Sequence, residues 1–244
     1  MEQPYTPEEM MAAVISRRVR DRVASATGAN SPIPAGGCLL AKATHAPNAR
    51  IIILGSEEYY PFATGKEFHD FVMRGNLDLF FLSGIQIDAD ANINLHVVGD
   101  YEQPRARFPG AFGSGAIYFM AKRVILFRTE HTRRTFVPHV DFITAPGHSE
   151  PSVHRPGGPV TVVTPMAVLI YNREAGRLEL ESVHPGHTID EVLANTGFLL
   201  PVREDVHETV PPTVEELELL RGPVRETLRR IYPAFVARAE AAAI

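Results

Sequence analysis

The amino-acid sequence predicts an α/β fold built on an open, mostly parallel sheet with helices on its faces. Unbroken apolar runs at 51–54 and 79–82 are typical of strands that are covered on both faces, as in parallel sheets. A helical pattern over residues 67–73 separates the two runs, so strands and helices alternate along the chain. Hydrophobic residues make up 45% of the 244 positions, which is enough for a sizeable core.

The N-terminal segment is expected to form two helices joined by a turn-rich stretch. Thr6, Pro7 and Glu9 supply a hydroxyl cap, a proline in the first turn and a glutamate three residues after the cap, which together form a capping box. Apolar residues then recur at three- and four-residue steps and predict one apolar helix face: Met10, Met11, Val14, Ile15, Val19 and Val23. Residues 28–37 are rich in proline and glycine and predict turns, and a short helix is expected at 39–43.

The second half of the chain is expected to add strands and then helices. Strands are predicted at 124–127, 160–163 and 167–171, and a turn at 172–176 leads into an alternating strand at 177–181. Thr213 and Glu216 form a second capping box, Pro223 interrupts the helix that follows, and a last helix is predicted over about 225–242. The sequence has no repeat and no clear linker. It therefore predicts one domain over residues 1–244, with a helical tail from about 213 to 244.

Composition and charge argue against several classes of function. The net charge is −5 and no basic run is present, so the sequence predicts no nucleic acid partner. The apolar runs are too short to span a bilayer, and the N-terminus has no signal-like segment, so we expect a cytoplasmic protein without a membrane partner. Cys38 is the single cysteine, and the ten histidines have irregular spacing, so neither a disulfide nor a metal site is predicted.

Two adjacent acids follow the first long apolar run and are candidates for catalysis. Parallel strands of an open α/β sheet present their carboxyl ends to ligands, and Glu57 and Glu58 come shortly after such an end. A carboxylate there can act as a nucleophile or a general base. The same two residues also fit solvated loop acids, so the pattern alone leaves both interpretations open.

Two later segments offer backbone N–H groups that could hold an oxyanion or a phosphate. Glycine lets the backbone approach a ligand closely, although turns are rich in glycine for structural reasons as well. The candidate residues for oxyanion or coenzyme A binding are Ser83, Gly84, Gln86, Gly113, Ser114 and Gly115.

Taken in order, these segments resemble the β-type subunits of the family I coenzyme A transferases, of the glutaconate type. The resemblance runs from Thr6 to about Leu220. It is carried by several short motifs in the family's order: Gln86-Ile87-Asp88 with Asn92 and Asn94, Gly99-Asp100-Tyr101 with Arg107 and Gly110, Arg133-Arg134, Asp141, Pro146-Gly147 and Asn195-Thr196-Gly197. The resemblance implies the open sheet of that family and a homologous α subunit as partner in an αβ or higher heteromer.

The resemblance also implies a covalent mechanism. A glutamate of the β-type subunit attacks the acyl-CoA carbonyl, and the enzyme then carries a glutamyl-CoA thioester that an acceptor carboxylate attacks. Coenzyme A is thus a substrate, no permanently bound cofactor is expected, and Glu57, or less readily Glu58, is the candidate nucleophile. Backbone donors at the candidate glycine segments would stabilise the oxyanion.

The chain departs from the family pattern at the nucleophile. The family's glutamate stands at the end of the first long strand, where this sequence has Leu54 and Gly55, and Glu57 comes two to three residues later. Ala91 also occupies a turn position where relatives have glycine. The alternatives are therefore an acyl-CoA hydrolase, lyase or decarboxylase on the same fold, and a non-catalytic subunit that shapes its partner.

Overall fold

The computed structural model describes residues 4–110 and 112–241. The chain divides into two compact units, Met1–Ala63 with Pro211–Ile244, and Thr64–Val210. The predicted C-terminal tail thus belongs to the same unit as the N-terminal segment. The expectation of one domain over the whole chain stays a prediction.

The first unit begins with a parallel strand pair and two helices. Helix α1 (Pro7–Ser16) precedes strand β1 (Ala24–Thr27), helix α2 (Pro32–Ala43) and strand β2 (Arg50–Ile53). The two strands pair in parallel, and α2 is the connection between them. Both members of the predicted capping box are present, because the Thr6 hydroxyl accepts from the Glu9 N–H and the Glu9 carboxylate accepts from the Thr6 N–H.

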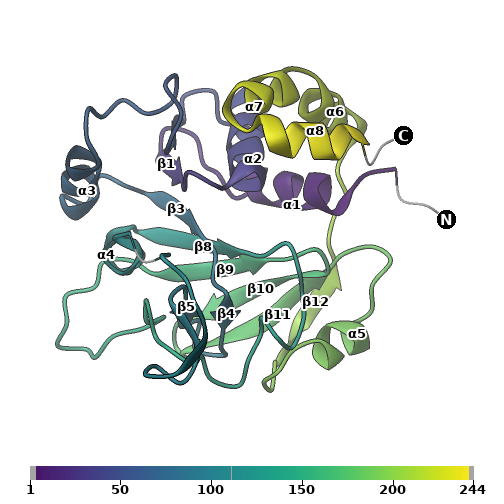
Figure 1. The fold of residues 1–244 in the computed structure, drawn as a ribbon. Coiled ribbons are helices and arrows are strands. Elements are labelled where there is room, and N and C mark those ends of the chain that lie inside the picture. The colour runs from purple at the N-terminus through teal and green to yellow at the C-terminus, as the bar shows by residue number, and fades with distance from the viewer. Residues whose placement is uncertain (1–3, 111, 242–244) are drawn as a thin grey trace. The chain divides into compact units, whose positions relative to one another are not determined.

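The C-terminal helices complete this unit. They are α6 (Val214–Leu219), η1 (Leu220–Val224), α7 (Arg225–Ile231) and α8 (Pro233–Ala241). Figure 1 shows them gathered beside α1 and α2. The Arg221 guanidinium donates to both carboxylate oxygens of Glu9 at 2.7 and 2.8 Å, and Arg17 pairs with Glu216 at 2.6 Å. These bidentate and short contacts fix the C-terminal helices on α1.

Two adjacent glycines of α2 have opposite surroundings. A Cβ added at Gly37 would lie 2.5 Å from Ile15 Cγ2 and 2.8 Å from the Ala12 carbonyl oxygen, whereas one at Gly36 would meet only Leu228 Cδ1 at 3.4 Å. Gly37 therefore lets α1 and α2 approach each other closely. Gly36 lies outside this contact between the two helices.

We expect Gly37→Ala to lower the free energy of unfolding by about 2 kcal/mol or more, because the added methyl forces the two helices apart. Gly36→Ala is the matched control and should raise it by about 0.5–1 kcal/mol, because alanine favours a helix over glycine. Urea unfolding of both full-length variants, followed by circular dichroism, measures the difference. Equal effects of the two substitutions would contradict the close approach at Gly37.

The second unit holds six neighbouring strands of the main sheet in the order β12-β11-β10-β9-β8-β3. Figure 1 shows β8 to β12 side by side. The pairs β3–β8, β8–β9 and β11–β12 are parallel, while β10 runs antiparallel to both β9 and β11. The strands are β3 (Leu79–Leu82), β8 (Arg123–Phe127), β9 (Pro159–Val163), β10 (Ala167–Asn172), β11 (Arg177–Val183) and β12 (Val202–Glu208). With the parallel pair of the first unit, this confirms the mostly parallel sheet predicted from the sequence.

Short elements fill the connections of the second unit. Its described residues form the helices α3 (Gly65–Met73), α4 (Ser114–Met120) and α5 (Ile189–Ala194). Two small antiparallel hairpins, which the sequence did not indicate, lie between β3 and α4: β4 (Gln86–Ile87) with β5 (Ile93–Asn94), and β6 (Val97–Gly99) with β7 (Pro104–Arg107). In the part of the chain that the structure describes, no helix is both long and apolar enough to cross a bilayer.

Candidate functional site

The segment after β2, where the sequence analysis places the candidate nucleophile, forms a closed turn. The Ile53 N–H donates to the Tyr59 carbonyl oxygen at 3.1 Å, so the chain returns on itself within six residues. The buried Ser56 hydroxyl accepts from the Tyr59 N–H at 3.1 Å and fixes the inside of the turn. Gly55 has φ +87°. A side chain at this position would be strained, so glycine is suited to the turn and a glutamate is not.

Glu57 and Glu58 lie at the exposed tip of this turn and differ in their partners. The Glu58 carboxylate accepts from the Arg230 guanidinium at 3.0 Å, and both side chains are more than half exposed, at 55% and 60%. Burial and the neighbouring Glu58 charge together raise the pKa of Tyr59. Among the described residues, no hydrogen bond or ion pair engages the Glu57 carboxylate. Of the two acids in this turn, Glu57 is thus the one whose carboxylate no other described residue engages.

Ser83 and Gly84 follow the buried end of β3. A Cβ at Gly84 would lie 2.8 Å from the Gln86 carbonyl oxygen and 3.2 Å from Ile93 Cβ, so close packing within the segment requires glycine here. Ser83 is half-buried. Close packing within the chain is thus sufficient to explain the glycine at position 84, which the sequence analysis had considered for an oxyanion site.

Gln86 is the buried centre of a polar network that reaches the surface at Asp141. Its side-chain oxygen accepts from Asn94 Nδ2 at 2.7 Å and from the Asp141 N–H at 2.9 Å, and its Nε2 donates to the Asp141 carboxylate at 3.0 Å. The same Asp141 oxygen accepts from the Gly99 N–H at 2.7 Å. Gln86, at 6% exposure, joins the β4–β5 hairpin to the β6 strand and to the loop at 141.

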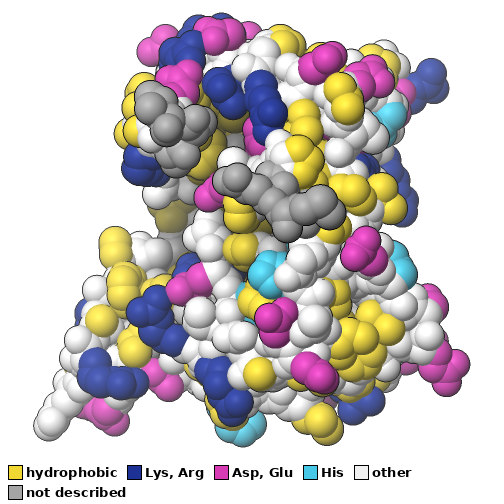
Figure 2. Space-filling view, turned by 90° about the vertical axis from the view of Figure 1, so that its right-hand side faces the viewer, with side chains coloured by type: hydrophobic (Ala, Val, Ile, Leu, Met, Phe, Trp, Pro, Cys, Tyr) yellow, Lys and Arg dark blue, Asp and Glu magenta, His cyan; other side chains and the backbone are white. Residues whose placement is uncertain are grey.

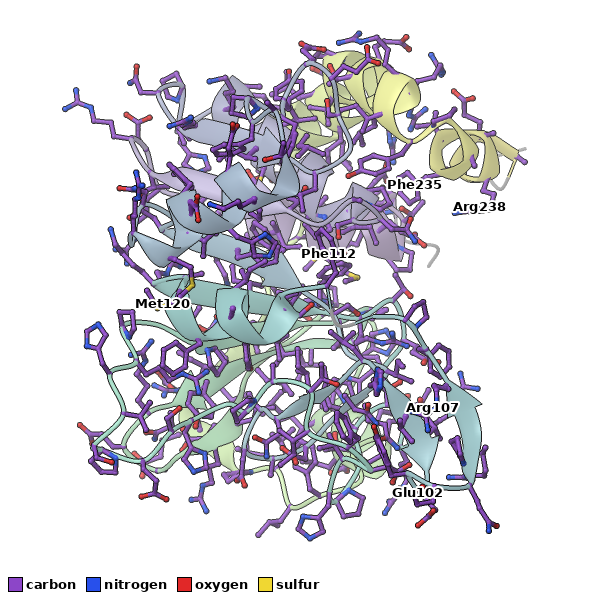
Figure 3. The ribbon with its side chains drawn as sticks, turned by 60° about the vertical axis from the view of Figure 1, so that its left-hand side comes forward. Glu102, Arg107, Phe112, Met120, Phe235 and Arg238 are labelled. Carbon is purple, nitrogen blue, oxygen red and sulfur yellow. The ribbon has the colours of Figure 1, made fainter. Side chains whose placement is uncertain are left out.

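We expect Gln86→Ala to lower the free energy of unfolding by about 2–3 kcal/mol, because it removes the three side-chain hydrogen bonds of a buried residue and leaves a void in its place. Asn94 keeps its bond to the Val97 carbonyl and Asp141 keeps its bond from the Gly99 N–H. Urea unfolding monitored by circular dichroism gives this value. Glu102→Ala, at the exposed turn of the β6–β7 hairpin (Figure 3), is the control and should change stability by less than about 0.5 kcal/mol. An unchanged stability of Gln86→Ala would show that the network is not structural.

The turn that precedes β5 has Ala91 in the left-handed region of the backbone. Ala91 has φ +58° and is fully buried, and the Tyr118 hydroxyl donates to its carbonyl oxygen at 2.7 Å. The Asp88 carboxylate accepts from the N–H and the side-chain amide of Asn92, both at 3.0 Å. These bonds hold Ala91 in the left-handed region, which costs a residue with a Cβ about 1–2 kcal/mol.

Gly113, Ser114 and Gly115 lie at the start of α4, which Figure 3 marks between Phe112 and Met120. Gly113 is the residue before the helix and has φ +70°, and a Cβ there would lie 2.1 Å from His69 Nε2. Ser114 is buried, and its hydroxyl donates to the Gly110 carbonyl at 3.4 Å. Gly115 has more room, with the Thr144 carbonyl oxygen 3.3 Å from an added Cβ. The conformation and the close packing at Gly113 thus require glycine. A side chain at Gly115 would need only a slight shift of the neighbouring Thr144 carbonyl.

The candidates therefore fall into three local groups. Ser83, Gly84 and Gln86 share the segment after β3, and the residues at 113–115 share the first turn of α4, both within Thr64–Val210. Glu57 and Glu58 share the turn after β2, within Met1–Ala63. The Gln86–Asp141 network was not predicted from the sequence, although the amides and acids of the motif were a signal for it.

Two histidines and the cysteine are buried inside the protein. His131, which is 4% exposed, contacts the Thr164 and Thr196 hydroxyls at 2.9 and 3.0 Å, and His184, which is 2% exposed, contacts the Thr209 hydroxyl and the Thr164 carbonyl, both at 2.9 Å. Cys38 is buried in α2, and burial raises the pKa of its thiol. No group of three or more potential ligands for a metal ion occurs within residues 4–110 and 112–241. Figure 2 shows basic and acidic side chains intermingled over one face.

Comparison with known proteins adds a consistent set of similarities. The family model described as coenzyme A transferase matches residues 6–195. The B-type chain of 3-oxoadipate CoA-transferase from Pseudomonas knackmussii is 33% identical over an alignment of 244 residues, which covers 89% of this chain and 93% of that one.

Solved structures are similar over nearly the whole chain. Glutaconate coenzyme A-transferase from Acidaminococcus fermentans superposes with a TM-score of 0.82 at 25% identity, over 93% of this chain and 98% of that one. The decarboxylase AibA/AibB superposes with a TM-score of 0.76 at 25% identity, over 91% and 98% of the two chains. The same fold is thus found in a transferase and in a decarboxylase.

Proposed function

Because the chain belongs to the coenzyme A transferase family, we propose that it is the β-type subunit of a heteromeric enzyme that moves CoA between an acyl-CoA and a free carboxylic acid. The transferase relatives named above are themselves single subunits of CoA-transferases, which supports a homologous α subunit as partner. The observation on which the transfer reaction depends is the unengaged carboxylate of Glu57 in the turn after β2.

The proposed reaction needs only carboxylates and a thioester. The Glu57 carboxylate attacks the acyl-CoA carbonyl, a C–O bond forms, the C–S bond breaks, and CoA leaves as thiolate. The thiolate then attacks the glutamyl carbonyl of the mixed anhydride, which releases the first acid and leaves a glutamyl-CoA thioester. The acceptor carboxylate repeats the two steps in reverse order, so Glu57 is regenerated and no water or redox partner is consumed.

A carboxylate is a weak nucleophile towards a thioester, so the oxyanion needs positioned donors. We place this role on the backbone N–H groups of two segments, Ser83 with Gly84 and residues 113–115. The first N–H groups of a helix have no acceptor within it, and Ser114 and Gly115 stand in the first turn of α4. The remote parts of CoA would supply binding energy for the attack.

A second candidate function is hydrolysis, carbon–carbon cleavage or decarboxylation of an acyl-CoA. It is favoured by the strand end itself, where Leu54 and Gly55 carry no carboxylate and Gly55 adopts a conformation that disfavours one. The similarity to a decarboxylase of the same fold is in line with this alternative. In that case the partner subunit would supply part of the chemistry.

Exchange and trapping experiments on the assembled heteromer distinguish the two. Transfer of CoA into an isotopically labelled free acid, without net loss of thioester, is expected for the transferase. Borohydride reduction during turnover should convert the glutamyl thioester to an alcohol, and peptide mass mapping should locate it at Glu57. Net cleavage of the substrate with no exchange and no modified glutamate would reject transfer and favour the second candidate.

A further inference from the structure

A second feature lies apart from all the predicted site residues. The unit Thr64–Val210 contains an open cavity of about 660 Å³, lined by residues between 147 and 159, by Asp90 and by the end of β10 with its following turn. We call it the Arg155 cavity. Its volume falls within the range of small-molecule sites.

Arg155 is held rigidly in the wall of this cavity. Its Nε donates to the Gly157 carbonyl at 3.1 Å, Nη1 donates to the Ser149 hydroxyl at 3.2 Å, and Nη2 contacts the Tyr118 carbonyl at 3.4 Å. The guanidinium carbon also lies 5.5 Å from the centre of the Tyr118 ring. Because a guanidinium has five N–H groups, two remain beyond these three bonds. The Arg155 side chain is therefore fixed in place and has two N–H groups left to bind a ligand.

The positive charge of Arg155 has no carboxylate partner among the described residues. Burial lowers the pKa of its guanidinium, which marks a charge held away from water, and the neighbouring Arg173 acts in the same direction. Uncompensated charge in a partly buried place is unfavourable unless an anion binds there. Arg173 itself is exposed and makes no ion pair in the described part of the chain.

Tyr171 supplies a further unpartnered group to the lining. Its side chain is 8% exposed, and its hydroxyl has no hydrogen-bond partner in the structure. Burial and the nearby Asp90 carboxylate raise the pKa of Tyr171, and the charges of Arg155 and Arg173 oppose that shift. Buried hydroxyls are nearly always hydrogen-bonded, so an orphan hydroxyl beside two arginines indicates a missing acceptor.

Three acids, Asp90, Glu150 and Glu174, also line the Arg155 cavity, and none of them forms an ion pair with Arg155. Like Arg173, they are exposed to solvent, where charges are screened, whereas Arg155 is partly buried. Gly158 leaves room for the guanidinium, because a Cβ added there would lie 3.1 Å from Arg155 Nη2. The part of the cavity that is removed from water thus combines a guanidinium, a hydroxyl and backbone.

We propose that the Arg155 cavity binds the phosphate group of a small phosphorylated ligand through Arg155, Arg173 and Tyr171. A phosphate carries up to two negative charges and several acceptor oxygens, and it matches two guanidinium groups and one hydroxyl better than a single carboxylate does. The phosphate can belong to CoA or to a separate phosphorylated effector. This inference involves no catalytic step and stands or falls independently of Glu57.

Calorimetric titration of the full-length chain with pyrophosphate tests the proposal, at constant ionic strength set with chloride. We expect saturable binding that Arg173→Gln and Tyr171→Phe each weaken at least about fivefold. Arg177→Gln is the matched control, because Arg177 is an exposed arginine of β11 that does not line the cavity. It should leave the affinity unchanged. Arg155→Lys should weaken binding further, since an ammonium lacks the planar fork.

Competition then identifies the source of the phosphate. Displacement of pyrophosphate by CoA but not by CoA lacking its 3′-phosphate assigns the site to that group of CoA. Binding of pyrophosphate that CoA does not affect assigns it to a separate effector. No saturable binding, or equal affinities of Arg173→Gln, Tyr171→Phe and Arg177→Gln, would overturn the proposal.

Discussion

Glu57→Gln is expected to lower the turnover number of the assembled heteromer at least about a thousandfold, with assembly and stability unchanged. Glutamine keeps the size and polarity of the side chain but cannot form the anhydride, and loss of a covalent nucleophile has effects of this order or larger. The side chain is exposed and makes no hydrogen bond or ion pair in the described structure, so its replacement should not disturb the turn. Steady-state CoA exchange and size-exclusion chromatography of the complex measure both quantities.

Glu58→Gln separates the two acids. It removes an exposed ion pair with Arg230, and such pairs contribute at most about 1 kcal/mol to stability. If Glu57 is the nucleophile, Glu58→Gln should retain activity within about threefold. Loss of activity only in Glu58→Gln would transfer the role to that residue, and full activity of both variants would identify a non-catalytic subunit or a reaction carried by the partner.

Sequence periodicity predicted the elements whose residues are strongly apolar. The apolar runs at 51–54, 79–82 and 124–127 correspond to β2, β3 and β8, and the predicted hairpin corresponds to β10 and β11. These strands are buried, so their apolar sequences match the positions that they occupy in the core. β1 was missed because Ala24–Thr27 consists of small residues whose strand conformation depends on pairing with β2. β12 was missed because Val202–Glu208 is a mostly polar and exposed edge strand.

Helix boundaries were less predictable than the presence of the helices. The first helix ends at Ser16 and not near Val23, and the last predicted helix is broken between Ile231 and Pro233. Proline disfavours helical geometry in the residue before it, and Tyr232 accordingly has φ −128° and ψ 61°. In contrast, α2 begins at Pro32, within a stretch predicted as turns, because proline is tolerated in the first turn of a helix.

The motifs that carry the family resemblance have mainly structural contacts in this chain. Gln86, Asp88, Asn92 and Asp141 bond to one another or to nearby backbone and hold the hairpin segments together. A sequence can show that such residues recur in order, but the partners of an amide or a carboxylate depend on how distant loops meet. The lack of a carboxylate at Leu54 and Gly55, in contrast, was visible from the sequence alone.

The buried histidines make the unit Thr64–Val210 sensitive to acid. Burial, followed by the nearby charges of His187 and His184, lowers the pKa of His131 to about 4. Burial also lowers the pKa of His184 to about 4, with an opposing contribution from its hydrogen bond to the Thr164 carbonyl. In the unfolded chain both imidazoles titrate near 6.5. Between these values the unfolded chain binds protons that the folded one does not.

The stability that the neutral histidines allow is therefore fully present above about pH 6.5 and is lost as the pH falls towards 4. The expected loss is about 3 kcal/mol for each histidine, a total comparable with the stability of a whole domain. Burial acts to raise the pKa of Glu130, but its hydrogen bonds and arginine neighbours lower it to about 2. The contribution of Glu130 to the free energy of unfolding is therefore lost only below about pH 4.5. The window from pH 6.5 to 5 thus reports mainly on the histidines.

Urea unfolding at pH 7, 6 and 5 tests this expectation, followed by circular dichroism because the chain has no tryptophan. His131→Gln should be less stable than the unmodified chain at pH 7, since it disturbs the bonds to Thr164 and Thr196, but its stability should fall by about half as much between pH 7 and pH 5. His154→Gln, at an exposed histidine, should retain the full pH dependence. The smaller slope is the decisive quantity, because a merely destabilising substitution shifts the curve without flattening it. Parallel curves for His131→Gln and His154→Gln would show that His131 is protonated as readily in the folded chain as in the unfolded one.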